Sequence, residues 1–428
     1  MQKLVINGGR TLTGSIDVQG SKNSVLPILA ATLTGEGQCV IRNCPRLSDT
    51  EAACDILRHL GCGVTRQEDA VIVDAGSGGI NDIPDELMRK MRSSVMFLGA
   101  ILAREQSAKI SFPGGCELGP RPIDLHISAL RQMGVRVSEE GGFLSCTCPN
   151  GLRGTSVSLA IPSVGATENI MLAAVKAKGE TVIHNAACEP EIVDLQNFLN
   201  AMGARIHGAG TSRIAIEGVE RLNGTEHRII PDRIVAATYL IVGCMGGGKV
   251  ELCGVIPEHI SAITGLLREM GVKIRVDGRR IMVYADTRPS APRTVRTTYY
   301  PGFPTDAQAL MMALACICRG SSLFIETVFE NRYRHVGELR RMGARIQVEQ
   351  RVAVVEGVEK LWGANVEATD LRGGAALMCA ALAAQGTTVI ERIEHIDRGY
   401  QAPEQVLSAL GADIKREEYE AERKTATE

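Results

Sequence analysis

The chain has 428 residues, which is longer than a single hydrophobic core usually grows, so two domains of roughly 200 residues are expected. Hydrophobic residues make up 45% of the chain, charged residues 22% and aromatic residues 4%, which is ordinary globular usage with a glycine-rich bias of 46 Gly. The formal net charge of −2 argues against a general nucleic-acid-binding protein, because such proteins carry a basic excess that neutralises phosphates. Any anionic ligand must therefore meet a local cluster of cations.

The N-terminal sequence MQKLVINGGRTLTGS contains no apolar stretch of signal-peptide length, and no apolar run long enough to span a membrane occurs anywhere. These features predict a cytoplasmic protein that does not associate with membranes. The 13 cysteines are scattered without a short, even framework, which in a long unexported chain is typical of reduced thiols. The closest pairs, Cys146 with Cys148 and Cys316 with Cys318, lack the spacing of a zinc site, so we expect buried thiols and no metal.

A short phrase recurs along the whole chain: an amphipathic run that ends in Leu or Met, then a glycine, then a β-branched stretch. The copies are almost evenly spaced, with their glycines at Gly61, Gly134, Gly203, Gly271, Gly343 and Gly411. Each unit is predicted to run strand, helix, strand, helix, then strands. A period of about 70 residues favours a small α/β subdomain used six times, three in each of two domains. The final KREEYEAERKTATE lacks apolar periodicity and is predicted to be a frayed, solvated tail.

The first helix of each unit has a recognisable start, and four of the six starts hold a basic residue: Lys22, Arg92, Arg233 and Arg372. A cation is unfavourable there, because a helix N-terminus already carries about half a positive charge. One explanation is an anion held between these side chains and the helix N–H groups. The alternative is that each basic residue is paired with a neighbouring carboxylate.

The third and fifth starts differ from the others. PSVGATEN offers Ser163, Gly165 and Thr167 in a turn whose backbone N–H groups suit a phosphate, although Ser163 is equally well explained as a helix N-cap. In FPTDAQAL, Asp306 stands at the expected start of a helix, where a role as helix N-cap is also adequate for it. Pairing with cations would depress the pKa of this carboxyl, but it could still accept a proton from a hydroxyl brought close to it.

Residues 113 to 126, PGGCELGPRPIDLH, contain too many glycines and prolines for a helix or a central strand and are predicted to form a loop. The loop holds one thiol, Cys116, and one guanidinium, Arg121. A cysteine beside a cation in a glycine-rich loop is in the setting that lowers thiol pKa and favours a reactive or proton-donating group. An incidental surface thiol is the alternative.

At these residues the sequence resembles the UDP-N-acetylglucosamine enolpyruvyl transferases (UDP-N-acetylglucosamine 1-carboxyvinyltransferases) over nearly the whole chain. The matching segments, in order, are GSKNSVLPILAA, MRSS, PGGCELGPRPIDLHISAL, PSVGATENIM, EPEIVD, PDRI, FPTDAQA, ETVFENRYRHVGEL, ATDLRGGAAL and HIDRGY. The resemblance implies a two-domain inside-out α/β barrel with central helices and outward sheets, closing over ligands in the cleft between its domains. It implies residues 22–229 as the first domain and residues 1–21 with 230–428 as the second.

The resemblance also implies a reaction. The enolpyruvyl group of phosphoenolpyruvate would pass to the 3′-hydroxyl of UDP-N-acetylglucosamine by addition and elimination, releasing phosphate. This is the first committed step of peptidoglycan precursor synthesis, and it links the protein to cell wall biogenesis, cell shape, cell division and the cell cycle. No cofactor and no nucleic acid partner are implied, and the oligomeric state stays open. Cys116 would protonate the methylene carbon and would be the group that fosfomycin alkylates.

Carried over residue by residue, the resemblance assigns two sets of ligands. For phosphoenolpyruvate, it implies Lys22, Arg121 and Arg398 at the phosphate, with further positioning by Asn23, Arg92, Arg332 and Arg372. For the nucleotide sugar, it implies Arg121, Asp124 and Leu125 around the uracil, Ser163, Val164 and Gly165 at the diphosphate, and Asp306 with Val328 at the amino sugar. Asp306 would accept the proton of the 3′-hydroxyl. The roles of Glu189, Glu191 and His126 stay open, with a packing anchor as the preferred interpretation of His126.

Two departures from the family pattern leave alternatives open. Val235, Ala236 and Ala237 stand where the family usually has Glu and then a Thr-Gly pair, which is consistent with a diverged second copy of the enzyme. Ile161 stands where some members have Lys. The rival hypotheses are a 5-enolpyruvylshikimate-3-phosphate synthase and an inactive paralogue that binds the nucleotide sugar. The PGGC loop and PSVGAT turn favour the nucleotide sugar as acceptor, and the retained Lys22, Cys116, Asp306 and Arg398 favour an active enzyme.

Overall fold

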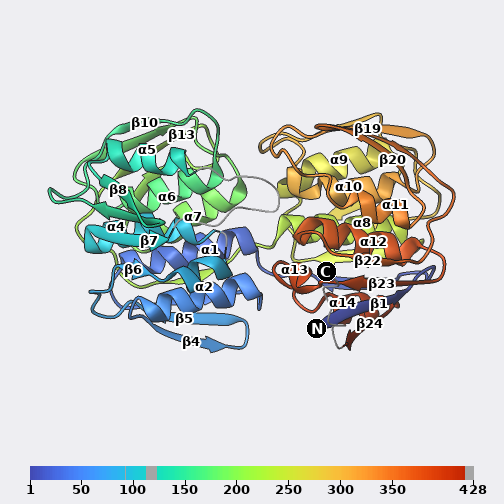
Figure 1. Cartoon of the computed structure of the whole chain (residues 1–428), viewed down its shortest axis with the longest axis horizontal. Helices are drawn as coiled ribbons and strands as arrows, with labels where there is room; N and C mark the ends of the chain where they lie inside the picture. The colour runs from blue at the N-terminus through green and yellow to red at the C-terminus, as the bar shows by residue number, and fades with distance from the viewer. Residues whose placement is uncertain (92, 112–122, 420–428) are drawn as a thin grey trace, which may run out of the picture. The chain divides into compact units, whose positions relative to one another are not determined.

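The computed structural model describes residues 1–91, 93–111 and 123–419, which fold into two compact units (Figure 1). Of these residues, Met1–Val18, Arg233–Thr298 and those from Gly302 onward form unit 1. Those within Gln19–Asp232, together with Tyr299–Pro301, form unit 2. The chain therefore leaves unit 1 after its first strands and returns to it at Arg233.

The described residues form six four-stranded sheets, three in each unit, and all six have one topology. In each sheet a parallel pair of strands is followed by two antiparallel strands. The sheets of unit 2 are β14-β3-β5-β4 (Glu226–Arg228, Gln38–Arg42, Ala70–Asp74, Gly63–Gln67), β6-β7-β9-β8 (Asp82–Ile83, Ser107–Ser111, Phe143–Thr147, Arg136–Glu140) and β10-β11-β13-β12 (Ser156–Ser158, Glu180–His184, Arg213–Glu217, Arg205–His207). The sheets of unit 1 are β2-β15-β17-β16 (Gly14–Asp17, Lys249–Cys253, Arg280–Tyr284, Lys273–Asp277), β18-β19-β21-β20 (Thr294–Arg296, Ser321–Ile325, Val352–Glu356, Arg345–Glu349) and β22-β23-β1-β24 (Asn365–Glu367, Thr387–Glu391, Gln2–Asn7, Asp413–Glu418).

Three buried helices occupy the middle of each unit, and the sheets lie outside them (Figure 1). They are α1 (Lys22–Ala31), α4 (Phe97–Glu105) and α6 (Val164–Ala174) in unit 2, and α8 (Arg233–Met245), α10 (Gln308–Ala315) and α12 (Leu371–Ala383) in unit 1. Every residue of α10 is buried, as expected of a helix that packs against neighbours on all sides. This arrangement confirms the predicted inside-out α/β fold with three repeated units in each half.

The outer helices and short turns complete each repeat. In unit 2 they are η1 (Thr32–Thr34), α2 (Ser48–His59), α3 (Asp85–Lys90), η2 (Ser94–Met96), α5 (Asp124–Gln132) and α7 (Pro190–Ala201). In unit 1 they are η3 (Pro257–Ile260), α9 (Ser261–Glu269), η4 (Thr305–Ala307), α11 (Val336–Arg341), α13 (Glu394–Asp397) and α14 (Pro403–Ala409). The order strand, helix, strand, helix, strands is the one predicted from the repeat.

The recurring glycines end the outer helices in the same way each time. After α2, Gly61 has φ +86°, its N–H bonds to Arg58 O at 3.1 Å, and the N–H of Cys62 bonds to Leu57 O at 3.0 Å. This is the Schellman arrangement, which favours glycine because the residue lies in the left-handed region. The other five have φ between +88° and +109°: Gly134, Gly203, Gly271, Gly343 and Gly411. The repeat is thus visible in the sequence because one backbone conformation recurs.

The last sheet corrects one expectation from the sequence. The segment from Lys415 onward is predicted to be a solvated tail, but Asp413–Glu418 form strand β24 and pair with the N-terminal strand β1, from Gln2↔Glu418 to Asn7↔Asp413. A strand whose partner lies at the opposite end of the chain has no local signal in an apolar pattern. The two ends of the described chain therefore complete one sheet of unit 1.

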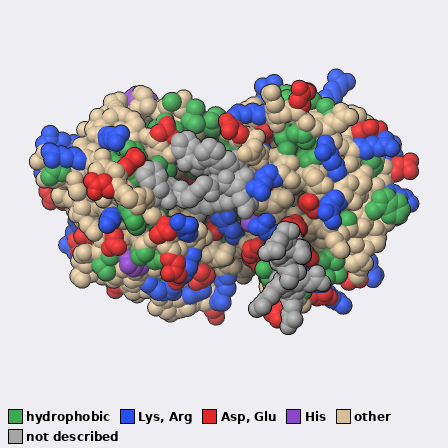
Figure 2. Space-filling view, in the orientation of Figure 1, with side chains coloured by type: hydrophobic (Ala, Val, Ile, Leu, Met, Phe, Trp, Pro, Cys, Tyr) green, Lys and Arg blue, Asp and Glu red, His purple; other side chains and the backbone are tan. Residues whose placement is uncertain are grey.

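The surface carries interspersed charges. On the described part of the face in Figure 2, Lys and Arg side chains lie among Asp and Glu side chains. Among the described residues, no helix combines the length and the apolar character needed to cross a lipid bilayer.

Candidate active site

The starts of the central helices lie where the sequence predicts them. Lys22 is the first residue of α1, Arg233 is the first of α8, and Arg372 is the second of α12. Arg92, the fourth predicted cation, lies outside the described residues, as do Cys116 and Arg121. The described candidate residues belong to both units.

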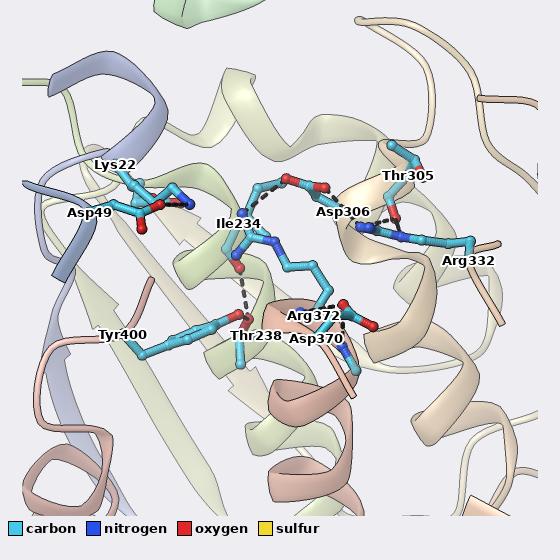
Figure 3. A network of polar contacts seen from close by, with 12 residues as sticks. Lys22, Asp49, Ile234, Thr238, Thr305, Asp306, Arg332, Asp370, Arg372 and Tyr400 are labelled. Atoms are coloured by element: carbon cyan, nitrogen blue, oxygen red, sulfur yellow. Dashed lines mark hydrogen bonds and ion pairs between the residues drawn. The ribbon is translucent and has the colours of Figure 1, made fainter. Parts of the chain in front are cut away.

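Asp306 lies at the centre of a charged cluster in unit 1. Its carboxylate accepts hydrogen bonds from Arg332 Nη2 at 2.8 Å and from Arg372 Nη2 at 2.9 Å (Figure 3). The Arg332 guanidinium also donates to Thr305 O, at 3.1 Å from Nη2 and 3.3 Å from Nε. Both arginine side chains are almost fully buried, whereas 28% of the Asp306 side chain is exposed. One carboxylate is therefore shared by two guanidinium groups that the family resemblance assigns to phosphoenolpyruvate.

The N-cap interpretation of Asp306 is wrong. Asp306 is the middle residue of η4, its N-cap position is Pro304, and no side chain caps that turn. Burial alone would raise the pKa of the Asp306 carboxyl, but the charges of Arg372, Arg332 and Arg233 and the hydrogen bond from Arg372 hold that pKa well below its usual range. Asp306 is therefore ionised at neutral pH and paired with arginines rather than with helix N–H groups.

Asp370 explains how a cation is tolerated at the start of α12. As the N-cap, its Oδ1 accepts hydrogen bonds from the N–H groups of Arg372 at 3.0 Å and Gly373 at 3.1 Å. Burial raises the pKa of the Asp370 carboxyl, but the charge of Arg332 and these backbone bonds outweigh burial and lower it. The negative cap offsets the unfavourable interaction between the Arg372 charge and the helix dipole.

Lys22 is paired in unit 2 in a comparable way. Its Nζ lies 2.8 Å from Asp49 Oδ2, and the Asp49 side chain is 2% exposed (Figure 3). The Lys22 backbone N–H donates to Asp232 Oδ2 at 3.1 Å. Asn23 is the second residue of α1. The alternative explanation of the helix-start cations, pairing with carboxylates, thus describes both Lys22 and Arg372 in this structure.

A buried aspartate, Asp194, forms a hydrogen bond with the first turn of α1. Asp194 on α7 accepts hydrogen bonds from the hydroxyl of Ser24 and, at 3.3 Å, from the N–H of Ile230. His227 Nε2 lies 2.9 Å from its other carboxylate oxygen. Since Ser24 is in the same turn as Lys22, Asp194 fixes the part of α1 that presents the lysine.

The described candidate residues for the uracil and the diphosphate lie at two helix starts of unit 2. Asp124 and Leu125 are the first residues of α5. Ser163 is the N-cap of α6 and accepts a hydrogen bond from the N–H of Ala166 at 3.3 Å, which confirms its capping role. Val164 and Gly165 follow as the first two residues of α6.

The remaining candidates of unit 1 lie near carboxylates. The N–H of Val328 donates to Glu326 Oε1 at 2.8 Å. Arg398 follows α13, whose last residue, Asp397, accepts two hydrogen bonds from Arg416 at 2.7 and 2.9 Å. Arg416, on β24, therefore fixes the end of the helix that precedes Arg398.

The described cysteines have the character expected of structural thiols. Burial raises the pKa of Cys146 to about 11 and those of Cys316 and Cys318 to about 12. All three are buried, as predicted from their sequence context. Within the described residues, no group of three or more His, Cys, Asp and Glu side chains is arranged to hold a metal ion.

The departures from the family pattern lie in two environments. Val235, Ala236 and Ala237 are buried in α8, whereas Ile161 is 50% exposed just before the N-cap of α6. Val235 therefore fills apolar space in unit 1.

Sequence reasoning missed the carboxylates that pair with the candidate cations. Asp49 is a first-turn acid of α2, which is a different helix from the one that begins at Lys22, so no local pattern links the two. Asp370 had a signal, because Thr-Asp before a helix predicts an N-cap. Glu326, which accepts hydrogen bonds from the Thr305 hydroxyl at 3.0 Å and from the N–H of Val328, was missed as well, because Thr305 lies 21 positions away in the chain.

Comparison with solved structures defines the class of the fold. The enolpyruvyl transferase NikO from Streptomyces tendae matches with a TM-score of 0.87 and 24% identity over 97% of this chain and 98% of that one. An EPSP synthase from Acinetobacter baumannii matches with a TM-score of 0.74 and 18% identity over 98% of this chain and 100% of that one. The chain thus has the fold of the enolpyruvyl transferases.

Sequence comparison defines the family. The sequence profile of EPSP synthase (3-phosphoshikimate 1-carboxyvinyltransferase) matches residues 6–420. UDP-N-acetylglucosamine 1-carboxyvinyltransferase 2 of Caldanaerobacter subterraneus is 51% identical over 97% of this chain and 100% of its own length. UDP-N-acetylglucosamine 1-carboxyvinyltransferase 1 of Symbiobacterium thermophilum is 50% identical over 97% of this chain and 95% of its own length. This chain belongs to the EPSP synthase family and, within it, to the UDP-N-acetylglucosamine 1-carboxyvinyltransferases, as its motifs indicated.

Proposed function

We propose that this protein transfers the enolpyruvyl group of phosphoenolpyruvate to the 3′-hydroxyl of UDP-N-acetylglucosamine and releases phosphate, an early step of peptidoglycan precursor synthesis. The observation that carries this proposal is that four relatives, 46–51% identical over 97% of the chain, are named for that acceptor and that transfer. The buried arginines of unit 1 and the lysine at the start of α1 supply the cations that a phosphate and a carboxylate require.

The proposal gives each candidate group a task. Lys22, Arg121 and Arg398 bind the phosphate of phosphoenolpyruvate, and Asn23, Arg92, Arg332 and Arg372 position that phosphate and the carboxylate. Arg121, Asp124 and Leu125 surround the uracil, Ser163, Val164 and Gly165 bind the diphosphate, and Val328 contacts the amino sugar. The two structural units act as two domains, residues 22–229 and residues 1–21 with 230–428. The pairing of Arg332 and Arg372 with Asp306 supports this assignment, because it holds both guanidinium groups in a fixed orientation.

The reaction proceeds by addition and then elimination. The 3′-oxygen forms a bond to C2 of phosphoenolpyruvate, its proton passes to Asp306, and C3 receives a proton from the Cys116 thiol. The intermediate then returns a proton from C3 to the Cys116 thiolate, the double bond between C2 and C3 re-forms, and the bond from C2 to the phosphate oxygen breaks. The departing phosphate takes up the proton held by Asp306. An ionised Asp306 is the form that can accept the proton, and weakening of its two arginine contacts on ligand binding would raise its basicity.

Phosphate release tests the function directly. The enzyme is supplied with phosphoenolpyruvate and either UDP-N-acetylglucosamine or shikimate-3-phosphate, with and without preincubation with fosfomycin. Release with the nucleotide sugar alone, abolished by fosfomycin in the native enzyme, is expected. Cys116→Asp, which retains a proton donor without a thiol, serves as the matched control and should resist the inhibitor. Release with shikimate-3-phosphate would overturn the acceptor, and no release with either would favour an inactive paralogue.

A further inference from the structure

A histidine and an asparagine join the two helix starts assigned to the nucleotide sugar. His126 lies in the first turn of α5 and is 7% exposed, and Asn169 lies on α6 and is fully buried. The Nδ1 atom of His126 is 2.9 Å from the Nδ2 atom of Asn169. The helix α6 packs against both α4 and α5 in unit 2 (Figure 1).

The backbone fixes which end of the Asn169 amide faces the histidine. The N–H of Gly99 donates to Asn169 Oδ1 at 2.5 Å, and Asn169 Nδ2 donates to Val95 O at 2.9 Å. A backbone N–H can only donate and a carbonyl can only accept, so the amide oxygen and nitrogen cannot be exchanged. Asn169 therefore presents an N–H to His126, and His126 Nδ1 must accept it. The single proton of the neutral imidazole is then on Nε2.

The proton-bearing side of the ring lies against the first turn of α6. A Cβ atom placed on Gly165 would lie 3.3 Å from His126 Cε1 and 3.5 Å from His126 Nε2. The distance to Cε1 is shorter than an ordinary van der Waals contact. Gly165 is helical and has no positive φ, so the limited space beside the imidazole, and not the backbone conformation, favours glycine here. Burial lowers the pKa of His126 to about 4, although the charge of Asp124 acts in the opposite direction, so the ring stays neutral at physiological pH.

We propose that Asn169 and His126 are a positioning pair that holds the first turns of α5 and α6 together as one preformed site for a uridine nucleotide diphosphate. Asn169 locks the imidazole as the Nε2–H tautomer, and the ring packed on Gly165 sets the spacing between Asp124 and Leu125 on one side and Ser163 to Gly165 on the other. A ring with its proton on Nδ1 would place N–H against N–H at Asn169 and lose this contact. The identity of the ligand rests on the proposed function, whereas the tautomer lock does not.

Two variants separate the two tasks of His126. His126→Asn retains an acceptor near the position of Nδ1 but removes the ring from Gly165, whereas His126→Phe retains a ring but leaves Asn169 without its acceptor. We expect each variant to weaken binding of UDP and of UDP-N-acetylglucosamine by about tenfold, the equivalent of one neutral hydrogen bond or of a similar packing loss. The KM for phosphoenolpyruvate should change by less than about twofold, since the pair supports the two helix starts assigned to the uracil and the diphosphate. Gly165→Ala should act in the same direction as His126→Asn.

The tautomer is measured without reference to activity. Long-range ¹H–¹⁵N spectra of the ¹⁵N-histidine-labelled enzyme should show the His126 resonances in the Nε2–H pattern, unchanged between pH 5.5 and 8, and assignment by comparison with His126→Asn identifies them. An Nδ1–H pattern, or titration in that range, would overturn the lock whatever the enzyme catalyses. Native UDP affinity in His126→Phe, confirmed as folded by its near-UV circular dichroism, would overturn the positioning role. Absence of UDP binding to the unmodified enzyme would overturn the ligand and the proposed function while leaving the spectra to decide the lock.

Discussion

Replacing Asp306 by Asn tests the charged cluster of unit 1 directly, because the substitution keeps the shape of the side chain and removes a negative charge that two buried cations share. The Arg332 and Arg372 side chains are 3% and 5% exposed, and each donates a hydrogen bond of 2.8 to 2.9 Å to this carboxylate. After the substitution both guanidinium groups remain charged, because the pKa of arginine is too high for them to deprotonate. The variant therefore loses the one negative charge that both guanidinium groups contact at Asp306.

The loss of stability follows from that imbalance. Breaking a buried ion pair by removing one partner costs about 3–5 kcal/mol, and the partial exposure of Asp306 places the expected loss near the low end, about 3 kcal/mol. Urea unfolding at pH 7 measures it. The matched control is Asp286→Asn in the same unit, since Asp286 pairs with Lys273 at the same 2.8 Å but both side chains are more than half exposed. That change should cost less than about 1 kcal/mol.

The same substitution separates binding from catalysis. Without the carboxylate, Arg332 and Arg372 no longer have an internal competitor, so phosphoenolpyruvate should bind Asp306→Asn more tightly than the unmodified enzyme in calorimetry. Turnover should fall by about 10²- to 10⁴-fold if Asp306 accepts the hydroxyl proton. Weaker binding of phosphoenolpyruvate together with unchanged stability would refute the reasoning, because both expectations come from the same two ion pairs.

Three further predictions concern the supports of the site. Asp49→Asn should lower the unfolding free energy by about 3 kcal/mol, because Lys22 would lose a buried carboxylate 2.8 Å away; an unchanged urea midpoint would contradict a structural role for the pair. Arg416→Lys should lower the free energy of unfolding by about 1–3 kcal/mol and raise the KM for phosphoenolpyruvate. The reason is that a lysine cannot form the two parallel hydrogen bonds to Asp397, the residue that precedes Arg398. As the control, Arg345→Lys, at the exposed ion pair with Glu356, should change neither quantity. Burial lowers the pKa of His335 to about 4 from an ordinary value near 6.5, so the unfolded chain binds more protons between these values and stability is lost as the pH falls through this window. The expected loss between pH 7 and pH 5 is about 2 kcal/mol, His335→Gln should reduce the slope, and parallel unfolding curves of the two proteins across that range would argue against a neutral buried histidine.

Local sequence patterns were sufficient to predict most of the fold. The Schellman glycines, the apolar central helices and the helix starts at Lys22, Arg233 and Arg372 are set by residues within one turn of each other, so a single sequence displays them. The pairing of β24 with β1 was missed because it joins the two ends of the described chain, and the alternating charges of β24 gave no apolar face to detect. The order of strands and helices in each unit was predicted from the repeat, whereas the pairing of strands within the sheets was not predicted.

Of the charged residues of the site, the cations could be predicted from the sequence, but most of the carboxylates that pair with them could not. Cations at helix starts stood out because they oppose the helix dipole, whereas carboxylates such as Asp49 at a helix start look like ordinary first-turn acids. The structure brings the two kinds together: Lys22 with Asp49, and Arg372 with Asp306, 66 positions away. Lys22 and Arg372 are thus each paired with a carboxylate of this chain, which fixes the position of the cation. A phosphate or carboxylate of the ligand must then replace the carboxylate of the protein at each cation. The free energy of binding therefore contains only the difference between the cation's interaction with the ligand and its interaction with that carboxylate. If Asp306 loses these contacts during that exchange, the same event that binds phosphoenolpyruvate frees the group proposed to take the proton of the acceptor.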